Sequence, residues 1–485
     1  MAKSVITHIR MSTTKDPKSG LYMVPAASFY YMVFANESAF QTIYLDMIGD
    51  HKTAANYLET FLKLQGKAPM LGSYSGDQSA VFHGAKVDDV YNYTHQNYNL
   101  DHGTVLWALA LHYLLTGDTE WLNHAAPNML KAAEWIIEQR NQTKITGNDG
   151  TPVLHYGLLP GGHLEDNSDW GYWFATNAYA CIGLQSTAEA FRKAGLPQAN
   201  QLEKEANDYL SDLRNSVKRT SELSPVVRLR NNTWVPFVPT RAHQRFRYFG
   251  PMLSDYYSRY GVDTTKTTRL YRLSATREVL YGPMVLVTTG IIQPNDPLAE
   301  AILDDWEDNI TMTSSLGLQI HGEVEDEYWF SRGGMVFQPN LQNPIKAYLL
   351  RNEIPAAIRN LYNGMVSCFF PDVNAFTEEY HKWGLGSGPM YKVADEARCL
   401  TRINDLLVME NNDELWLAPG TPRYWLEPGK EIRLYHTATV FGNVSYVLKS
   451  GSAPHTVEAE INLPANFSAK KIKLFVRSPL EKPIK

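Results

Sequence analysis

The 485-residue chain repeats an amphipathic helical hairpin along its first two thirds, and this repeat limits the possible folds more than any other feature. Apolar residues follow helical spacing over residues 106–114, stop at residues 116–118 and resume over residues 130–137. A sharper hairpin joins residues 179–194 to residues 202–217. These patterns predict antiparallel helix pairs joined by short turns.

The turns of the hairpins recur at a regular spacing. Gly49, Gly117 and Gly195 are 68 and 78 residues apart, and a further turn at Asn352 follows 157 residues later, about twice the previous step. The double step predicts one more hairpin between them. We expect its turn near Gly282, which precedes a proline.

A further helix is expected over residues 394–409. Helical hairpins repeated at a fixed period form either a stacked array or a closed ring. Long segments separate the hairpins here, such as residues 65–101 and 140–171, whereas an open solenoid has shorter and more uniform units. We therefore predict a mainly α protein whose six hairpins form an (α/α)6 toroid over about residues 20–410. Because long loops usually carry function, substrate should enter at their end of the ring.

The sequence changes character after about residue 410. Short alternating or β-branched segments follow, separated by Pro and Gly, at residues 415–417, 432–434, 444–448, 457–463 and 472–476. We therefore predict a candidate catalytic toroid over residues 1–410 and a small β-sandwich-like domain over residues 411–485. A last strand of this domain is expected beyond Lys485.

Composition and charge disfavour several classes of partner. The 45 lysines and arginines and 51 aspartates and glutamates give a net charge of -6, and no basic cluster marks a nucleic-acid-binding surface. The most apolar stretch, residues 279–292, is shorter than the roughly 18 residues that cross a bilayer. We therefore expect neither nucleic acid nor a membrane as partner, and the oligomeric state stays open.

Cys181, Cys368 and Cys399 lie far apart, without the spacing of a zinc site or a disulfide framework. Each is expected to be a small buried hydrophobe, and no metal or cofactor is predicted. The N-terminal residues do not follow the pattern of a signal peptide, because polar and charged residues interrupt the first apolar segment. The chain as written is expected in the cytoplasm, and a longer natural chain would leave export open.

Three segments between the expected helices combine carboxylates with aromatic residues. They read EDNSDWGYW, HGEVEDEYW and FTEEYHKW, at residues 165–173, 321–329 and 376–383. Hydrolysis of a glycosidic bond needs two carboxyl groups on opposite sides of the bond, and aromatic faces stack on the C–H surfaces of sugars. Asp166 and Asp169 could equally cap a helix. Three such segments in one helical chain nevertheless favour a carbohydrate substrate.

The predicted ring of hairpins followed by a β-domain resembles the six-hairpin glycosidases, a group that includes glucoamylases, trehalases, processing α-glucosidases and α-L-rhamnosidases. In the trehalase and processing-glucosidase branches the acid lies in an E-S-G-x-D loop. Here Glu165 and Asp169 keep the spacing of Glu and Asp, although the Ser-Gly pair is absent. Their base lies in a Glu-x-Tyr segment shortly before the final helix, and Glu378, Glu379 and Tyr380 are similar in sequence and position.

The resemblance implies a glycoside hydrolase that acts on an oligo- or polysaccharide with inversion. In that mechanism Asp169 is the general acid and Glu378 is the general base. Reserve candidates for the two roles are Asp166, Glu165, Glu379 and Glu325. Residues expected to contact the sugar are Trp170, Trp173, Tyr328, Trp329, Trp383, Tyr380 and His381. Residues 176–180 and 418–420 resemble the corresponding segments of bacterial members of this group that act on plant or host glycans.

Two other functions stay open. Residues 243–248 (HQRFRY) could supply the base and the cations of a polysaccharide lyase acting on a uronate, although such an enzyme would more naturally have a basic cleft. A toroid that binds carbohydrate or serves as a scaffold without catalysis is also compatible, because fold does not determine function. The acidic residues of segment 323–327 are expected to form a solvated rim of the ring. Hydrogen bonds to sugar hydroxyls are the alternative, and a cation site is not expected.

Overall fold

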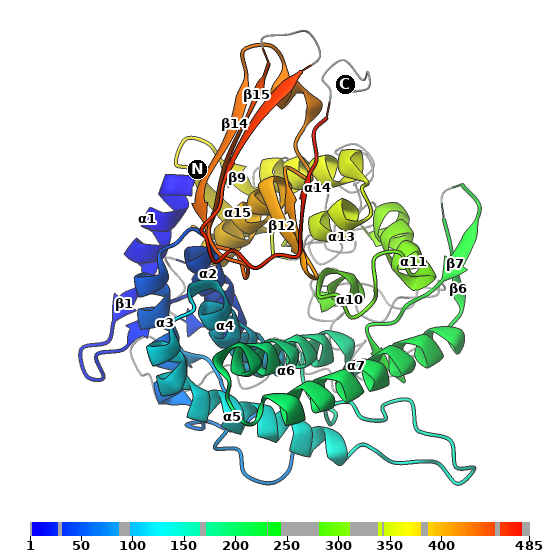
Figure 1. The fold of residues 1–485 in the computed structure, drawn as a ribbon. Coiled ribbons are helices and arrows are strands. Elements are labelled where there is room, and N and C mark those ends of the chain that lie inside the picture. The colour runs from blue at the N-terminus through cyan, green and yellow to red at the C-terminus, as the bar shows by residue number, and fades with distance from the viewer. Residues whose placement is uncertain are drawn as a thin grey trace.

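The computed structural model describes residues 2–27, 32–86, 98–164, 171–229, 231–243, 281–310, 338–341, 344–379, 387–451 and 456–477. These residues are mainly helical, with several small sheets and a group of longer strands at the C-terminus (Figure 1).

Six helices of the described residues form an inner ring around the centre of the molecule (Figure 1). Each packs against the next, and the last packs against the first, so the ring is closed. In chain order they are α2 (Ala35–Met47), α4 (Leu100–Thr116), α6 (Phe174–Ala194), α10 (Met284–Thr288), α13 (Ile345–Leu350) and α15 (Val393–Leu407).

An outer helix packs against each inner helix. Five outer helices follow their inner partners directly in the chain: α3 (His51–Leu64), α5 (Thr119–Asn141), α7 (Ala199–Glu222), α11 (Pro297–Asp305) and α14 (Ile354–Cys368). The sixth, α1 (Ala2–Ser12), packs against α15 from the opposite end of the chain. This arrangement confirms the predicted (α/α)6 toroid.

The ring begins near residue 2, and the expected start near residue 20 was wrong. The buried face of α1 is narrow, because its two buried apolar residues, Val5 and Ile9, are four positions apart and polar residues surround them. Such a short stripe gives little periodicity. Helix α1 is nevertheless an integral part of the ring, because it completes the hairpin of α15.

The hidden hairpin consists of α10 and α11, but its turn differs from the prediction. The turn lies at residues 289–296 and contains Gly290 in the left-handed region with a φ of 77°, whereas Gly282 precedes α10. Pro283, at the N-cap position of α10, has a φ of -58°. Because proline suits the start of a helix as well as a turn, its presence did not distinguish between the two.

Helices α4 and α6 approach each other closely because small residues line their contact. A β-carbon on Gly103 would collide with the backbone of Ala180, and one on Gly183 would lie 2.7 Å from Gly103 O. Only glycine permits this spacing between the two backbones. The contact fixes how the first turns of α4 and α6 lie relative to each other.

Short turns join the helices of each hairpin at one end of the ring. Gly117 and Gly195 end α4 and α6 in the left-handed region, with φ values of 67° and 72°, and these turns lie where the sequence predicted them. The longer segments all connect an outer helix to the next inner helix. Each of them therefore leads into the start of an inner helix at the other end of the ring, which we call the long-loop end.

The C-terminal strands cover the short-turn end. The Ala438 N–H donates a hydrogen bond of 3.1 Å to Met47 O at the end of α2. Lys193 Nζ, in the last turn of α6, donates a hydrogen bond of 2.9 Å to Val440 O. These contacts place the C-terminal strands at the short-turn end of the ring, opposite the long-loop end.

The C-terminal strands form two three-stranded sheets, ordered β12-β13-β17 and β14-β15-β16. All five strands predicted for this region are present, together with β12, which pairs Val408 with Leu417. Helix α15 consequently ends at Leu407 rather than at residue 409. The strands are β12 (Val408–Asn411), β13 (Glu414–Leu417), β14 (Glu431–Thr437), β15 (Val444–Ser450), β16 (Val457–Asn462) and β17 (Lys471–Leu474).

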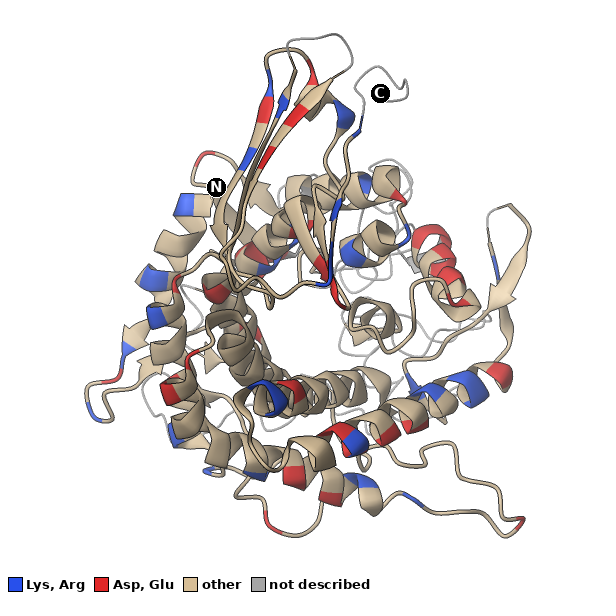
Figure 2. Cartoon of the chain, viewed as in Figure 1, with Lys and Arg blue, Asp and Glu red and all other residues tan. Residues whose placement is uncertain are grey.

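Charged residues of both signs are scattered over most outer helices and the C-terminal strands, whereas the charged residues of α11 are all acidic (Figure 2). Among the described residues, no helix is long and apolar enough to cross a membrane. Cys181, Cys368 and Cys399 are buried thiols, as the sequence predicted.

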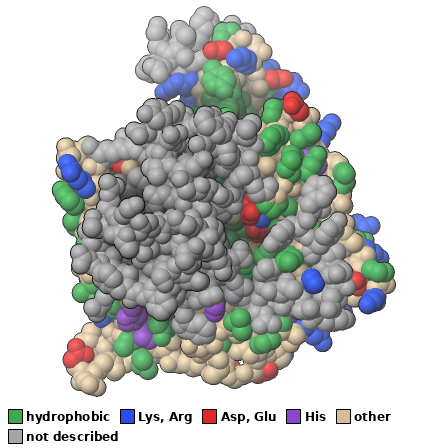
Figure 3. Space-filling view, turned by 180° about the vertical axis from the view of Figure 1, so that it is seen from behind, with side chains coloured by type: hydrophobic (Ala, Val, Ile, Leu, Met, Phe, Trp, Pro, Cys, Tyr) green, Lys and Arg blue, Asp and Glu red, His purple; other side chains and the backbone are tan. Residues whose placement is uncertain are grey.

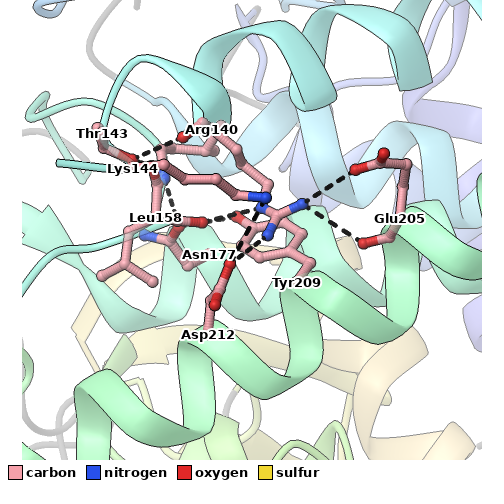
Figure 4. A network of polar contacts seen from close by, with 10 residues as sticks. Arg140, Thr143, Lys144, Leu158, Asn177, Glu205, Tyr209 and Asp212 are labelled. Carbon is pink, nitrogen blue, oxygen red and sulfur yellow. Dashed lines mark hydrogen bonds and ion pairs between the residues drawn. The ribbon is translucent and has the colours of Figure 1, made fainter. Parts of the chain in front are cut away.

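A buried arginine ties the segment after α5 to α7. Arg140 Nε donates to Gly157 O at 2.8 Å, its Nη2 lies 2.8 Å from Asp212 Oδ2, and its guanidinium stacks on the Tyr209 ring at 4.1 Å (Figure 4). Tyr209 in turn donates a hydrogen bond of 2.7 Å to Asn177 Oδ1 on α6. This network holds the segment that leads to the long-loop end.

Candidate active site

Buried carboxyl groups gather at the N-terminal ends of the inner helices. Glu37 lies in the first turn of α2, Asp101 in that of α4, and Asp395 and Glu396 in that of α15. A helix N-terminus favours negative charge, because its free N–H groups carry a partial positive charge. The fold thereby places carboxyl groups around the long-loop end of the ring. The space-filling view of Figure 3 shows acidic side chains set among hydrophobic ones near the centre of the rear face.

Glu378 reaches this end from a strand. It lies on β10 (Ala375–Glu379), which pairs with β9 (Phe369–Phe370) and with β11 (Ser387–Met390). The register of β10 and β11 shifts between Thr377 and Glu379, and such irregularities redirect side chains. The side chain of Glu378 is 23% exposed, so solvent reaches it, whereas the neighbouring side chains of Glu37 and Lys392 are buried.

Lys392 joins these groups. Its ammonium Nζ lies 2.7 Å from Glu378 Oε1 and 3.0 Å from Glu37 Oε2, and the lysine side chain is only 4% exposed. Lys392 occupies the N-cap position of α15, three residues before Asp395. We call Glu37, Glu378, Lys392 and Asp395 the carboxylate cluster.

The charges of the cluster act on each other strongly. Burial disfavours the charged form of Lys392, but the carboxylates of Glu37 and Glu378 outweigh burial and raise the pKa of the ammonium above its ordinary value. Burial raises the pKa of Asp395 well above its ordinary value, and Lys392 opposes this effect only in part. Gln338 Nε2 donates a hydrogen bond of 3.1 Å to Asp395 Oδ2. The cluster therefore combines a carboxyl that favours its protonated form with carboxylates paired to a cation.

Strand β10 is tied to the start of α15 on both sides of its backbone. The Phe376 N–H donates to Glu396 Oε1, and the Lys392 N–H donates to Phe376 O, each at 3.0 Å. Glu396 also hydrogen-bonds His8 Nδ1 of α1 at 2.8 Å. Glu378 thus projects from a strand that is fixed to two helices.

Asp101 has a structural role at the same end. Its carboxylate accepts hydrogen bonds from the Ala35 N–H at 3.3 Å and from the Asn36 N–H at 3.0 Å. These N–H groups belong to the start of α2, which otherwise has no side-chain cap. Asp101 therefore fixes the first turn of the helix that carries Glu37.

Of the carboxylates predicted from sequence, the structure describes the side chain of Glu378 alone. Glu379 is described as part of β10, where it pairs with Ser387. The other predicted site residues lie outside the described residues: Glu165, Asp166, Asp169, Trp170, Glu325, Tyr328, Trp329, Tyr380, His381 and Trp383. Their roles stay predictions.

The residues that flank segment 165–170 are well defined. Gly162 and Gly171 exchange two backbone hydrogen bonds of 3.0 Å, and Trp173 Nε1 donates to Gly162 O at 2.9 Å. Strand β5 (Tyr172–Trp173) then leads into α6. The segment that carries Asp169 therefore departs from the long-loop end, the same end as Glu378.

The position of Trp173 differs from the expected one. Its side chain is part of the core, with 2% exposure, and the Arg241 guanidinium lies 4.7 Å from its ring centre. Strand β8 (Arg241–Ala242) pairs with β5 and brings this arginine there. The indole ring of Trp173 therefore offers little surface to a sugar, because it packs in the core.

Glu37, Lys392 and Asp395 were not predicted as site residues. The sequence contained only a weak indication for Asp395, because acidic residues are favoured in the first turn of a helix whether or not that turn belongs to a functional site. For Glu37 there was none, because α2 is buried on almost all sides. Only the closure of the ring brings Glu37 to Lys392, 355 residues away.

Histidines of the long-loop end form a second aromatic group. His155 Nδ1 lies 2.7 Å from His243 Nε2, and the His155 ring stacks on Tyr172 with centroids 3.9 Å apart. Burial, and then the charge of His243, lower the pKa of His155 to about 4. His155 is therefore neutral near pH 7, and residues 244–248 of the segment predicted for a lyase lie outside the described residues.

Solved structures of other proteins are similar to this chain. A metal-independent α-mannosidase of Streptococcus pneumoniae, in a non-productive complex with α-1,6-mannobiose, covers 84% of this chain and 92% of its own, with a TM-score of 0.50 and 11% identity. A structure named "Glycosidase Wild Type" covers 84% and 95%, with a TM-score of 0.49 and 12% identity. The glycoside hydrolase family 15 glucoamylase from Hypocrea jecorina covers 82% and 70%, with a TM-score of 0.49 and 10% identity.

No protein-family model and no curated protein matches the sequence. The similarity to the mannosidase shows that this chain has the toroid fold found in glycosidases. Within the described residues, no group of three His, Cys, Asp or Glu side chains is arranged to hold a metal ion.

Proposed function

We propose that the protein is a glycoside hydrolase that acts on an oligo- or polysaccharide at the long-loop end of its toroid. The carboxylate cluster supports this function most directly, because Glu378 is partly exposed beside carboxyl groups that are buried. The likeness in fold to an α-mannosidase agrees with a carbohydrate substrate.

In the proposed mechanism Glu378 is the general base and activates a water molecule. A base has to be ionised, and Glu378 is paired with the ammonium of Lys392 through Oε1. Asp169 is proposed as the general acid, since the segment that carries it departs from the same end of the ring. Single displacement with inversion would place the two carboxyl groups about 6.5–9.5 Å apart.

The proposed division of labour follows the chain. Residues 1–410 would form the catalytic unit, and residues 411–485 would support it from the short-turn end. Contacts of Ala438 and Val440 with α2 and α6 agree with such a supporting role.

The test is turnover on a panel of aryl glycosides and plant glycans, with the anomer of the first product followed by NMR. Glu378→Gln and Asp169→Asn should each lower kcat by about 10²–10⁴-fold. Titration of oligosaccharides against tryptophan fluorescence should show that both variants still bind. Glu353→Gln is the matched control, because this glutamate pairs with Arg351 at the short-turn end.

Each contrary outcome would indicate a different function or a different catalytic residue. Ultraviolet absorbance from an unsaturated product would identify a lyase. Binding without turnover on every glycan would favour a carbohydrate-binding scaffold. Near-normal turnover in Glu378→Gln would move the base to Glu379 or Glu325, and near-normal turnover in Asp169→Asn would move the acid to Asp166 or Glu165.

A further inference from the structure

A cavity of about 330 Å³ lies inside the ring, toward the end that the C-terminal strands cover. Residues of all six inner helices line it, and Ala438 and Thr439 close part of one side. The volume is at the lower end of the range for small-molecule sites. None of the residues of the carboxylate cluster lines this cavity, so it is separate from the candidate active site.

One face of α15 brings charges into the cavity. Arg398, Arg402 and Asp405 follow each other at intervals of four and three residues, all three are less than 10% exposed, and all line the cavity. Lys346 of α13 adds a third cation to the lining. An inner helix normally presents apolar residues at such positions, so this face is specialised.

The arginines are only partly satisfied. Arg402 Nη1 donates to Asp405 Oδ2 at 2.9 Å, but Arg402 Nε is buried and has no hydrogen-bond partner among the described residues. Arg398 Nε donates a long hydrogen bond of 3.3 Å to Leu341 O, and its guanidinium stacks on Phe40 at 4.2 Å. Buried donors without partners are costly, and a guanidinium without its full set of acceptors is rare in a protein interior.

Like charges face each other here. Burial, and then the charge of Arg402, lower the pKa of Arg398 to about 10. The described lining also contains two acidic residues. One of them, Asp405, forms an ion pair with Arg402. The other, Glu410, accepts a hydrogen bond of 2.7 Å from the Val440 N–H, and burial raises its pKa. Even with both acids ionised, three cations leave a surplus of positive charge in the described lining.

The opposite wall of the cavity is different. Trp107 and Leu111 of α4, with Tyr179 and Ile182 of α6, present a largely apolar surface to it. Trp107 and Tyr179 lie with ring centroids 6.4 Å apart. The cavity therefore has a cationic side and an apolar side, which suits a ligand with one charged end.

We propose that this cavity binds a small organic anion, independently of the proposed glycosidase activity. Its phosphate or carboxylate group lies beside Arg398 and Arg402 and accepts the unused Arg402 N–H, and its apolar part contacts Trp107 and Leu111. The planar guanidinium fork matches both kinds of oxyanion. An anion at this position also relieves the repulsion between the two arginines.

The test is calorimetric titration and thermal unfolding of the full chain with inorganic phosphate, phenyl phosphate and benzoate, at an ionic strength held constant with sodium chloride. Each ligand should bind saturably, and phenyl phosphate should bind more tightly than inorganic phosphate because of the apolar wall. The comparison of phenyl phosphate with benzoate decides between a phosphate and a carboxylate. A rise in Tm without saturation is the general effect of an excluded salt and would count against a site.

Two variants test the site in opposite directions. Lys346→Met removes a cation from a partly exposed position and should weaken binding roughly tenfold or more. Asp405→Asn removes a negative charge next to Arg402 and should strengthen binding, an effect that mere destabilisation does not produce. Lys63→Met, on the outer surface of α3, is the matched control and should bind as the unaltered chain does.

Absence of saturable binding would overturn the proposal, and so would equal affinities in Lys346→Met, Asp405→Asn and the unaltered chain. Binding that is lost in Glu378→Gln but kept in Lys346→Met would place the anion in the carboxylate cluster and would also refute it. Loss of glycosidase activity plays no part in this test, so the two proposals fail separately.

Discussion

Lys392 Nζ lies 2.7 Å from Glu378 Oε1 and 3.0 Å from Glu37 Oε2, so one buried ammonium joins a strand carboxylate to a carboxylate in the first turn of α2. Glu37 and Lys392 are 355 residues apart in the chain, and the three residues meet because α15 closes the ring against α2. The same cation therefore contributes to ring closure and to the position of the proposed base.

Removal of this cation should destabilise the protein strongly. In Lys392→Met the carboxylates of Glu37 and Glu378 stay close together without a partner, and the loss of one member of a buried ion pair costs about 3–5 kcal/mol. Chemical denaturation should show this drop in the free energy of unfolding. Lys430→Met is the control: Lys430 and Glu427 pair on the surface with about half of each side chain exposed, and such pairs contribute about 1 kcal/mol or less. Equal losses in the two variants would contradict the structural role of Lys392.

Arg140 should be nearly as sensitive. It is fully buried, and Arg140→Met removes its hydrogen bond to Gly157 O and its ion pair with Asp212 (Figure 4). We expect a loss of about 3–5 kcal/mol in the free energy of unfolding. The double variant with Asp212→Asn should lose less than the sum of the single variants, by about 0.5–3 kcal/mol, because the carboxylate no longer lacks a partner. Strictly additive losses in denaturant titrations would show that the two residues do not interact.

The sequence was sufficient for the architecture wherever an element buries a broad apolar face. Helix α7 is an example, since its buried residues recur regularly over 24 positions. It was insufficient for α10, which has five residues, and for α1, whose apolar stripe consists of Val5 and Ile9. Short elements rely on contacts with the rest of the ring, and local spacing does not contain that information.

The candidate site was predictable only in part, for a related reason. Glu378 stood out because an acid beside aromatic residues before a final helix resembles a known family. Lys392 and Glu37 could not be recognised in the sequence, because they belong to the site only through a contact between residues 355 positions apart. Arg398 and Arg402 are charged and buried inside the ring, contrary to the usual rule that charged residues on a helix face solvent.

The three cysteines should not react in the folded protein. Burial raises the pKa of the Cys181 thiol to about 12 and raises that of Cys399 as well, so almost no thiolate forms near neutral pH. A thiol-specific reagent such as DTNB should therefore release almost no colour from the native protein. In denaturant it should detect all three thiols of the sequence. Rapid reaction of even one thiol in native buffer would contradict the burial of Cys181, Cys368 and Cys399.

His102 should make the stability depend on pH. It is fully buried on α4, its Nδ1 accepts a hydrogen bond of 3.1 Å from the Phe82 N–H, and its Nε2 lies 3.2 Å from Ala132 O, so the neutral form with the proton on Nε2 satisfies both contacts. Burial lowers the pKa of His102 from 6.5 to about 4. Between these values the unfolded chain binds more protons than the folded one, and the free energy of unfolding falls as the pH falls.

The expected loss from His102 between pH 6.5 and pH 4 is up to about 3 kcal/mol. Because other groups also titrate in this window, the measurement is a comparison of denaturant midpoints at pH 7 and pH 4.5 for the unaltered chain and for His102→Gln. The variant should be less stable at pH 7, since glutamine does not fill the same space, but it should lose less on acidification. His124→Gln, at a side chain that is 53% exposed, is the matched control and should keep the original pH dependence. An unchanged slope in His102→Gln would show that a different group causes the acid sensitivity.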